Sequence, residues 1–158
     1  MEDRIRLSIT DGIADVRLNR ADKMNALDPA MFKAIADTGA RLKQNTSVRA
    51  IVLSGEGRAF CAGLDVERIA ALTRGESILP FADLTQRTHG IANFVQHIVW
   101  IWREIAVPVI AAVHGVAFGG GFQLARCRPA IRRTRDAVGR DREQVGRPRS
   151  ARSSVMPV

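Results

Sequence analysis

Three successive glycines, Gly119 to Gly121, are the residues of this chain whose type and spacing point most directly to chemistry. They follow an apolar run, Pro108 to Val113, that predicts a strand, and they open what we expect to be a helix. The first N–H groups of a helix have no partner inside it, and glycines leave these groups uncovered at the positive end of the helix dipole. The pattern therefore predicts a site that receives negative charge.

A second glycine-containing loop, Gly57 to Asp65, has the same features, because it follows a predicted strand that ends at Ser54 and precedes a predicted helix. Two loops that bring uncovered backbone donors to one point form an oxyanion hole, which stabilises negative charge on a carbonyl oxygen during acyl chemistry. Taken alone, the three glycines also fit close helix-to-sheet packing or a simple turn. A phosphate-binding P-loop is excluded, because no Lys-Ser/Thr pair follows the glycines.

These two motifs, G-R-A-F-C-A-G-L-D at 57–65 and V-x-G-x-A-x-G-G-G at 113–121, resemble those of the crotonase (enoyl-CoA hydratase/isomerase) superfamily. L-N-R-x-x-x-x-N-A-L at 18–27 belongs to the same pattern. The resemblance covers about residues 4–125. It implies an α/β fold, a crotonase-like ββα spiral that stops after the helix start of the oxyanion hole, and processing of acyl-CoA through a stabilised thioester enolate.

The resemblance also implies the site residues. The two oxyanion donors are the backbone N–H groups of Leu64 and Gly120. The residues expected to bind the substrate around them are Arg20, Lys23, Ala62, Gly63, Asp65, Gly119 and Gly121. Arg20 and Lys23 match the region that meets the adenine and phosphates of coenzyme A, and a solvated surface charge is the alternative for both. The coenzyme A thioester is the substrate, and no separate cofactor is implied.

Gln123 stands where a hydratase of this family carries the first of two carboxylates that activate water. An amide holds a water by hydrogen bonds but cannot take its proton at neutral pH. Glu143 has the spacing of the second carboxylate, but its arginine-rich surroundings do not match the family pattern. Hydration, double-bond isomerisation and C–C cleavage all stay open, and so does a non-catalytic acyl-CoA-binding role.

Other polar residues near the motifs have structural interpretations. Asp65 is a candidate N-cap, Cys61 has no evident His partner and fits a small buried packing role, and His114 follows a strand and fits a turn. His89 and His97 fall on a predicted helix, where packing or solvent contact is expected. No metal site is indicated, because the three histidines and two cysteines lack ligand spacing.

Hydrophobic patterning predicts the elements that must position these loops. In chain order they are a hairpin (Ile5 to Leu18), a helix (Pro29 to about Gln44, with Asp28 as N-cap), a strand (Arg49 to Ser54), a helix from Asp65 that carries Val66, Ile69 and Leu72, a long helix (Phe81 to Glu104), and the strand before the glycines.

The net charge of +8 comes almost wholly from the end of the chain. Residues 1–125 carry 14 Lys and Arg against 13 Asp and Glu, whereas residues 126–158 carry 10 Arg, no Lys and three acidic residues. We therefore expect an incomplete acyl-CoA-binding core, 1–125, and an Arg-rich, disordered tail, 126–158. A basic tail can bind nucleic acid, but such arms normally mix Lys with Arg, so a frame-shifted translation fits the composition better.

Nothing at the N-terminus is typical of a signal peptide, and the most apolar region, Phe94 to Val113, is broken by charged residues and Pro108. With only two cysteines, the chain is expected in the cytoplasm, without membrane contact. For the intact family fold the resemblance implies a trimer-based homo-oligomer. The helical region that makes those contacts has no counterpart in residues 126–158, so we do not expect the trimer of this chain.

Overall fold

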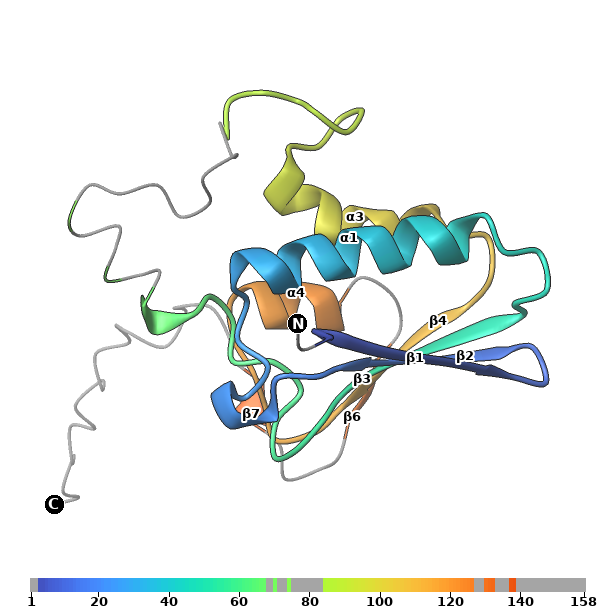
Figure 1. The fold of residues 1–158 in the computed structure, drawn as a ribbon, viewed down its shortest axis with the longest axis horizontal. Coiled ribbons are helices and arrows are strands. Elements are labelled where there is room, and N and C mark those ends of the chain that lie inside the picture. The colour runs from blue at the N-terminus through green and yellow to red at the C-terminus, as the bar shows by residue number, and fades with distance from the viewer. Residues whose placement is uncertain are drawn as a thin grey trace, which may run out of the picture.

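A five-stranded sheet with helices packed on one face forms the body of the protein (Figure 1). The structure is a computed structural model, and it describes residues 3–67, 70, 74, 84–126, 130–132 and 137–138. The strands of the sheet, in spatial order, are β1 (Ile5–Thr10), β2 (Ile13–Leu18), β3 (Ala50–Gly55), β4 (Val109–Val113) and β6 (Ala130–Arg132). β1 is antiparallel to β2 and the other pairs are parallel, so the predicted α/β class is confirmed.

The first two strands form the predicted hairpin. Asp11 and Gly12 at its tip both have positive φ, 51° and 78°, which is the conformation that a tight two-residue hairpin turn requires. Alternate residues of β2, namely Ala14, Val16 and Leu18, are fully buried beneath the helices. The hairpin therefore gives the sheet one apolar face on which the helices pack.

Helix α1 (Pro29–Lys43) begins where the sequence predicted, because the Asp28 side chain accepts a hydrogen bond from the backbone N–H of Met31 at 2.7 Å. It lies beside α3 (Phe94–Glu104) over the sheet (Figure 1). A Cβ at Gly39 would lie 2.8 Å from two carbons of Ile101 on α3. A glycine inside α1 is thus explained by the close approach of the two helices.

The predicted long helix from Phe81 to Glu104 is wrong in its first part. Residues 81–83 lie outside the described residues, and 84–93 form turns. α3 starts only after Asn93, whose side chain accepts from the N–H of Gln96 while Gln96 accepts from the N–H of Asn93. This capping box fixes the first turn of α3, and the positive φ of Gly90 shows that the residues before it are not helical, although their apolar spacing resembles that of a helix.

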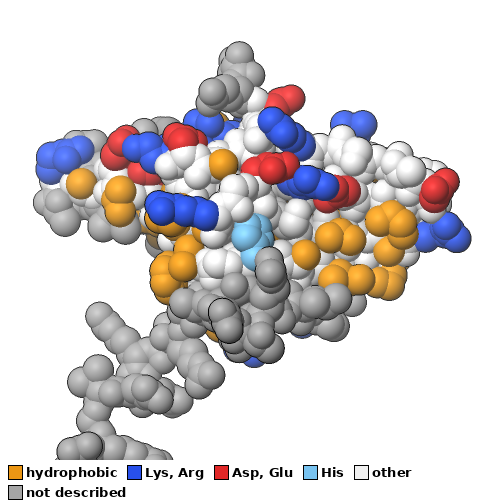
Figure 2. Space-filling view, turned by 90° about the horizontal axis from the view of Figure 1, so that it is seen from below, with side chains coloured by type: hydrophobic (Ala, Val, Ile, Leu, Met, Phe, Trp, Pro, Cys, Tyr) orange, Lys and Arg blue, Asp and Glu red, His pale blue; other side chains and the backbone are white. Residues whose placement is uncertain are grey.

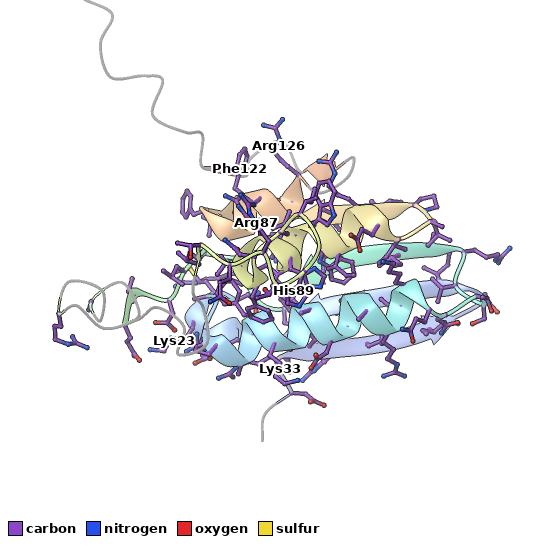
Figure 3. The ribbon with its side chains drawn as sticks, turned by 90° about the horizontal axis from the view of Figure 1, so that it is seen from above. Lys23, Lys33, Arg87, His89, Phe122 and Arg126 are labelled. Carbon is purple, nitrogen blue, oxygen red and sulfur yellow. The ribbon has the colours of Figure 1, made fainter. Side chains whose placement is uncertain are left out.

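Two short strands and a short helix follow β4. β5 (Val116–Ala117) leads to α4 (Gly120–Ala125), with Gly119 as its N-cap, and α3 lies between α1 and α4 (Figure 3). β6 extends the main sheet, and β7 (Ala137–Val138) pairs with β5. These two strands differ from the unstructured tail expected for 126–158; the rest of that tail after Arg126 lies outside the described residues.

The loop between β2 and α1 contains a short 3-10 helix, η1 (Ala21–Lys23). After Asp65 the chain turns helical at Val66 and Glu67, as predicted, whereas Ile69 and Leu72 lie outside the described residues. In the part of the chain that the structure describes, no helix is long and apolar enough to cross a membrane.

The sheet face opposite the helices carries both apolar and charged side chains. Ile13 is exposed there, and Val52 and Ile110 on the neighbouring strands are half-buried. Arg17 on the same face pairs with Asp15 at 2.6 Å. Figure 2, seen from this side, shows hydrophobic side chains gathered over one part of the face and charged ones over another.

Candidate functional site

Residues 61–65 form a loop that backbone hydrogen bonds tie to the segment before α1. The N–H of Leu27 donates to the carbonyl of Gly63 at 2.7 Å, and the N–H of Asp65 donates back to the carbonyl of Leu27 at 3.1 Å. A third bond joins the N–H of Ala62 to the carbonyl of Met24 at 2.9 Å. One edge of the loop is thereby fixed.

The other edge of this loop is bonded to β5. The N–H of Cys61 donates to Val116 at 3.1 Å, and the N–H of Phe118 donates to the carbonyl of Cys61 at 3.0 Å. A Cβ at Gly63, where φ is +86°, would lie 2.7 Å from the carbonyl oxygen of Phe118, and one at Gly121 would collide with the carbonyl of Cys61. The two glycine loops that the sequence singled out therefore touch, backbone against backbone.

Two backbone donors at this contact have no partner among the described residues. Among the hydrogen bonds of the described residues, none uses the N–H of Leu64 or the N–H of Gly120. Gly120 is the first residue of α4, where helix geometry leaves the N–H without an internal acceptor, and Gly119 before it has φ +48° with open space where a Cβ would be. Neither donor is therefore used by another group in the described part of the chain.

Asn25 connects the loop after β2 to the loop after β3. It is fully buried, and its side-chain amide donates to the carbonyls of Glu56 and Ala59 at 2.9 and 2.8 Å and accepts from the N–H of Arg20. A buried polar side chain is favourable only when its hydrogen bonds are made, as they are here. The second asparagine of the L-N-R-x-x-x-x-N-A-L motif is therefore a structural brace of the site.

The Arg20 side chain is largely buried and pairs with the carboxylates of Asp65 and Asp28. Its guanidinium lies 2.5 Å from Asp65 and 3.6 Å from Asp28, and the side chains of Arg20 and Asp65 are 11% and 3% exposed. Lys23 on η1 is the solvent-facing cation of this loop, about half exposed and 3.5 Å from Glu67 (Figure 3). Arg20 is therefore a positioning residue that holds two loops together.

Asp65 is the N-cap that the sequence suggested, since its carboxylate accepts from the N–H of Glu67 at 2.9 Å. Burial raises its pKa, but the hydrogen bonds from Arg20 and Glu67 and the charges of Arg20 and Lys23 outweigh burial, so the net pKa is below the ordinary range. Asp65 is ionised at neutral pH and makes structural bonds with both oxygens.

The remaining candidates take structural roles. Burial raises the pKa of the Cys61 thiol to about 11, although the N–H of Gly63 opposes it, so the thiol is protonated and not nucleophilic at neutral pH. His114 contacts the carbonyl of Gly57 at 3.0 Å, as a turn residue would. His89 and His97 stack with ring centroids 4.1 Å apart. Within the described ranges, no group of three or more His, Cys, Asp or Glu could hold a metal ion.

Comparisons with known sequences and structures identify the family and the fold. The model of the enoyl-CoA hydratase/isomerase family matches residues 8–131. The chain belongs to this family. Its relatives include a hydroxycinnamoyl-CoA hydratase-lyase of Pseudomonas fluorescens, 35% identical over 80% of this chain and 44% of the relative, and a 4-chlorobenzoyl coenzyme A dehalogenase of an Arthrobacter species, 31% identical over 77% of this chain and 41% of the relative. The chain thus spans less than half the length of these curated relatives.

Solved structures confirm the crotonase fold. An enoyl-CoA hydratase of Mycobacterium smegmatis matches with a TM-score of 0.68 and 29% identity, covering 83% of this chain and 48% of that structure. An enoyl-CoA hydratase/isomerase of Mycobacterium paratuberculosis matches with a TM-score of 0.71 and 27% identity, covering 87% of this chain and 52% of that structure. The described sheet and helices are therefore about the first half of a crotonase-type arrangement.

A pocket of about 330 Å³ is lined by residues of α3, of the turns before α3 and of α4. Gln123, which is exposed and one turn into α4, lines it, so the structure places the predicted water-holding residue at a cavity. Sequence reasoning missed the other wall residues, which are Arg87, Ile91, Ala92, Gln96, Val99, Trp100 and Arg103. Four of these fall on one face of α3, a spacing that was visible in the sequence.

Replacing Gly63 with alanine will separate the two loops. The new methyl group meets a backbone oxygen, which cannot rotate away, so we expect Gly63→Ala to lower the free energy of unfolding by about 2–4 kcal/mol. Gly90→Ala is the matched control, because Gly90 also has positive φ but open space where the methyl group would go; it should cost about 1 kcal/mol. Equal losses in denaturant titrations of the two variants would show that the loops do not depend on this contact.

Asp65→Asn will leave the buried charge of Arg20 with only its more distant partner Asp28. We expect a loss of about 3 kcal/mol at neutral pH. Because the folded pKa of Asp65 is lowered, its stabilisation is fully present above the unfolded pKa of about 3.9 and is lost as the pH falls through the folded pKa. The wild-type and Asp65→Asn stabilities should therefore begin to converge as the pH falls below about 4 and become equal only below the folded pKa of Asp65.

Asp37→Asn is the control for this substitution, since Asp37 pairs with Lys33 on the exposed face of α1. Its unfolding free energy should stay within about 0.5 kcal/mol of wild type. If the unfolding free energies of the wild type and Asp65→Asn differed by the same amount at every pH, the role assigned to the Asp65 carboxylate would be contradicted.

Proposed function

We propose that this chain binds acyl-CoA thioesters and stabilises their enolates, with the thioester carbonyl oxygen between the N–H groups of Leu64 and Gly120. The observation that carries the proposal is the pair of unpartnered backbone donors where the two glycine loops touch. Removal of one such donor typically raises a reaction barrier by about 3 kcal/mol, because the donors are already oriented before charge develops. An oxyanion hole is the function that this arrangement supports best.

Membership of the enoyl-CoA hydratase/isomerase family supports the same substrate class. Two relatives carry an aromatic acyl-CoA in their names, a hydroxycinnamoyl and a 4-chlorobenzoyl thioester, although the reactions named are a hydratase-lyase and a dehalogenase reaction. What such substrates share is a thioester carbonyl. The proposal for this chain is therefore the carbonyl-polarising step, and the reaction that follows depends on the other groups in the site.

Gln123 is the group in the pocket that would hold a water or a substrate oxygen. Its amide both donates and accepts hydrogen bonds, but it is not a base at neutral pH. This favours a second candidate function, an acyl-CoA binder that polarises the carbonyl without completing a hydration. The two candidates share one binding geometry and differ only in turnover.

The proposal is tested by the contribution of the carbonyl oxygen to binding. Hexanoyl-CoA and the hexyl-CoA thioether differ in that oxygen, so the thioester should bind the chain about tenfold or more tightly, from two hydrogen bonds of about 1 kcal/mol each. Isothermal titration calorimetry measures both dissociation constants. Equal affinities would place the carbonyl outside the two donors and refute the oxyanion hole.

Gln123→Glu is expected to create measurable hydration of crotonyl-CoA, because it restores a general base next to the pocket. The consumption of the conjugated thioester is followed by its ultraviolet absorbance. Arg126→Gln, at the C-cap of the same helix and with its guanidinium over the ring of Phe122, is a matched control and should show no gain. Binding of crotonyl-CoA without any hydration by Gln123→Glu would show that this position is not what limits turnover.

A further inference from the structure

Leu27, in the segment before α1, lies against both glycine loops at once. Its backbone is bonded to the residues on either side of Leu64. Its side chain is buried, with the residue 1% exposed, and lies beside Gly120. One residue thus contacts the carriers of both proposed oxyanion donors, which come from segments far apart in the sequence.

The backbone of Leu27 sets the direction of the Leu64 N–H. The N–H of Leu27 donates to Gly63 at 2.7 Å and its carbonyl accepts from Asp65 at 3.1 Å, so that Leu27 and Leu64 form a parallel β-bridge. In such a bridge the bonds are made by the residues on either side of the central one, whose own N–H points to the opposite side. The Leu64 donor is therefore directed away from the Leu27 backbone.

The side chain of Leu27 sets the position of Gly120. A Cβ on Gly120 would lie 2.7 Å from Cδ1 of Leu27. Carbon atoms that are not bonded to each other make contact at about 3.5–4 Å, so the leucine methyl group occupies the space that a side chain at 120 would need. Gly120 is not among the residues with positive φ, so its backbone conformation does not itself demand glycine. Among the described residues, the contact that favours glycine at this position is the one with Leu27.

Leu27 is itself held firmly by its neighbours in the chain. Asn25, two residues earlier, is fully buried and bonded to the loop after β3. Asp28, the next residue, caps α1 and pairs with Arg4 at 2.8 Å. A buried leucine on a fixed backbone is restricted to few rotamers by its packed surroundings. Leu27 is therefore suited to act as a spacer of fixed length between the two loops.

We propose that Leu27 is the positioning residue of the oxyanion hole, because it sets the separation and the relative direction of the N–H groups of Leu64 and Gly120. The inference rests on the proposed function, which takes the thioester carbonyl oxygen to lie between these two groups. A hydrogen bond weakens steeply when its distance or angle departs from the ideal values. Both donors therefore bind one oxygen atom only while Leu27 keeps the start of α4 at its distance from the 61–65 loop.

The first test is Leu27→Val, which shortens the side chain and withdraws the contact with Gly120. Wild type should bind hexanoyl-CoA about tenfold more tightly than the hexyl-CoA thioether. In Leu27→Val this preference should fall to about twofold, the loss expected when one of the two hydrogen bonds is misaligned. The affinity for the thioether should stay unchanged, whereas a general loss of structure would weaken the binding of both ligands alike.

Leu42→Val is the matched control. Leu42 is buried in the same core, but it lies in the last turn of α1, about 20 Å along the axis from the end beside Leu27. This variant loses the same methylene group from the core and should keep the tenfold preference for the thioester.

A second test addresses the contact from the side of Gly120. Gly120→Ala keeps the N–H but places a methyl group against Leu27, so the preference for the thioester should fall. In the double variant Leu27→Val/Gly120→Ala the alanine methyl group takes the space that the leucine methyl group has left. Most of the preference should therefore return, which is the coupling expected of two residues in direct contact.

The outcomes separate this inference from the proposed function. A tenfold preference that persists in Leu27→Val, an equal loss in Leu42→Val, or a double variant no better than Leu27→Val would overturn the role of Leu27 and leave the oxyanion hole intact. Equal affinities of wild type for the two ligands would refute both. If Leu27→Val does not fold, Gly120→Ala decides the question, because an undiminished preference there would show that the spacing does not depend on Leu27.

Discussion

The close approach of two backbone segments with no side chain between them is the constraint on which the candidate site depends. Residues 58–65 and 115–121 meet at points where a Cβ does not fit: Gly63 faces Phe118, Gly121 faces Cys61, and Gly115 faces the carbonyl of Arg58. Hydrogen bonds from Cys61 and Phe118 close the contact. Because only glycine permits this distance, the N–H groups of Leu64 and Gly120 are carried on backbone whose position the fold sets.

The sheet brings these segments together. β2, β3 and β4 are adjacent and parallel, so their carboxyl ends lie at one edge, and the loops that follow them meet there. Asn25 and Arg20 come from the first loop, Asp65 from the second and the glycine helix start from the third. Their charged and amide hydrogen bonds join the first two loops, and backbone contacts join the second to the third. The order of the strands is therefore as necessary for the site as the sequence motifs are.

Local signals made much of this predictable. The Asp11-Gly12 turn, the Asp28 N-cap and the glycines at 119–121 each act within a few residues, and the structure confirms the elements they predicted. The start of α3 was missed because apolar spacing continues through residues that form turns, and the Asn93 capping box decides the boundary. The inward direction of Arg20 depends on Asp65, which is distant in sequence, so no local pattern reveals it.

The most direct measurement is the vibrational frequency of the thioester carbonyl in the bound state. Hexanoyl-CoA labelled with ¹³C at the carbonyl allows isotope-edited infrared difference spectra of the free and bound ligand. Two oriented N–H donors withdraw electron density toward the oxygen and weaken the C=O bond. A shift of the stretch to lower wavenumber on binding is the expected result. A bound thioester whose carbonyl frequency equals that in water would contradict the oxyanion hole formed by Leu64 and Gly120.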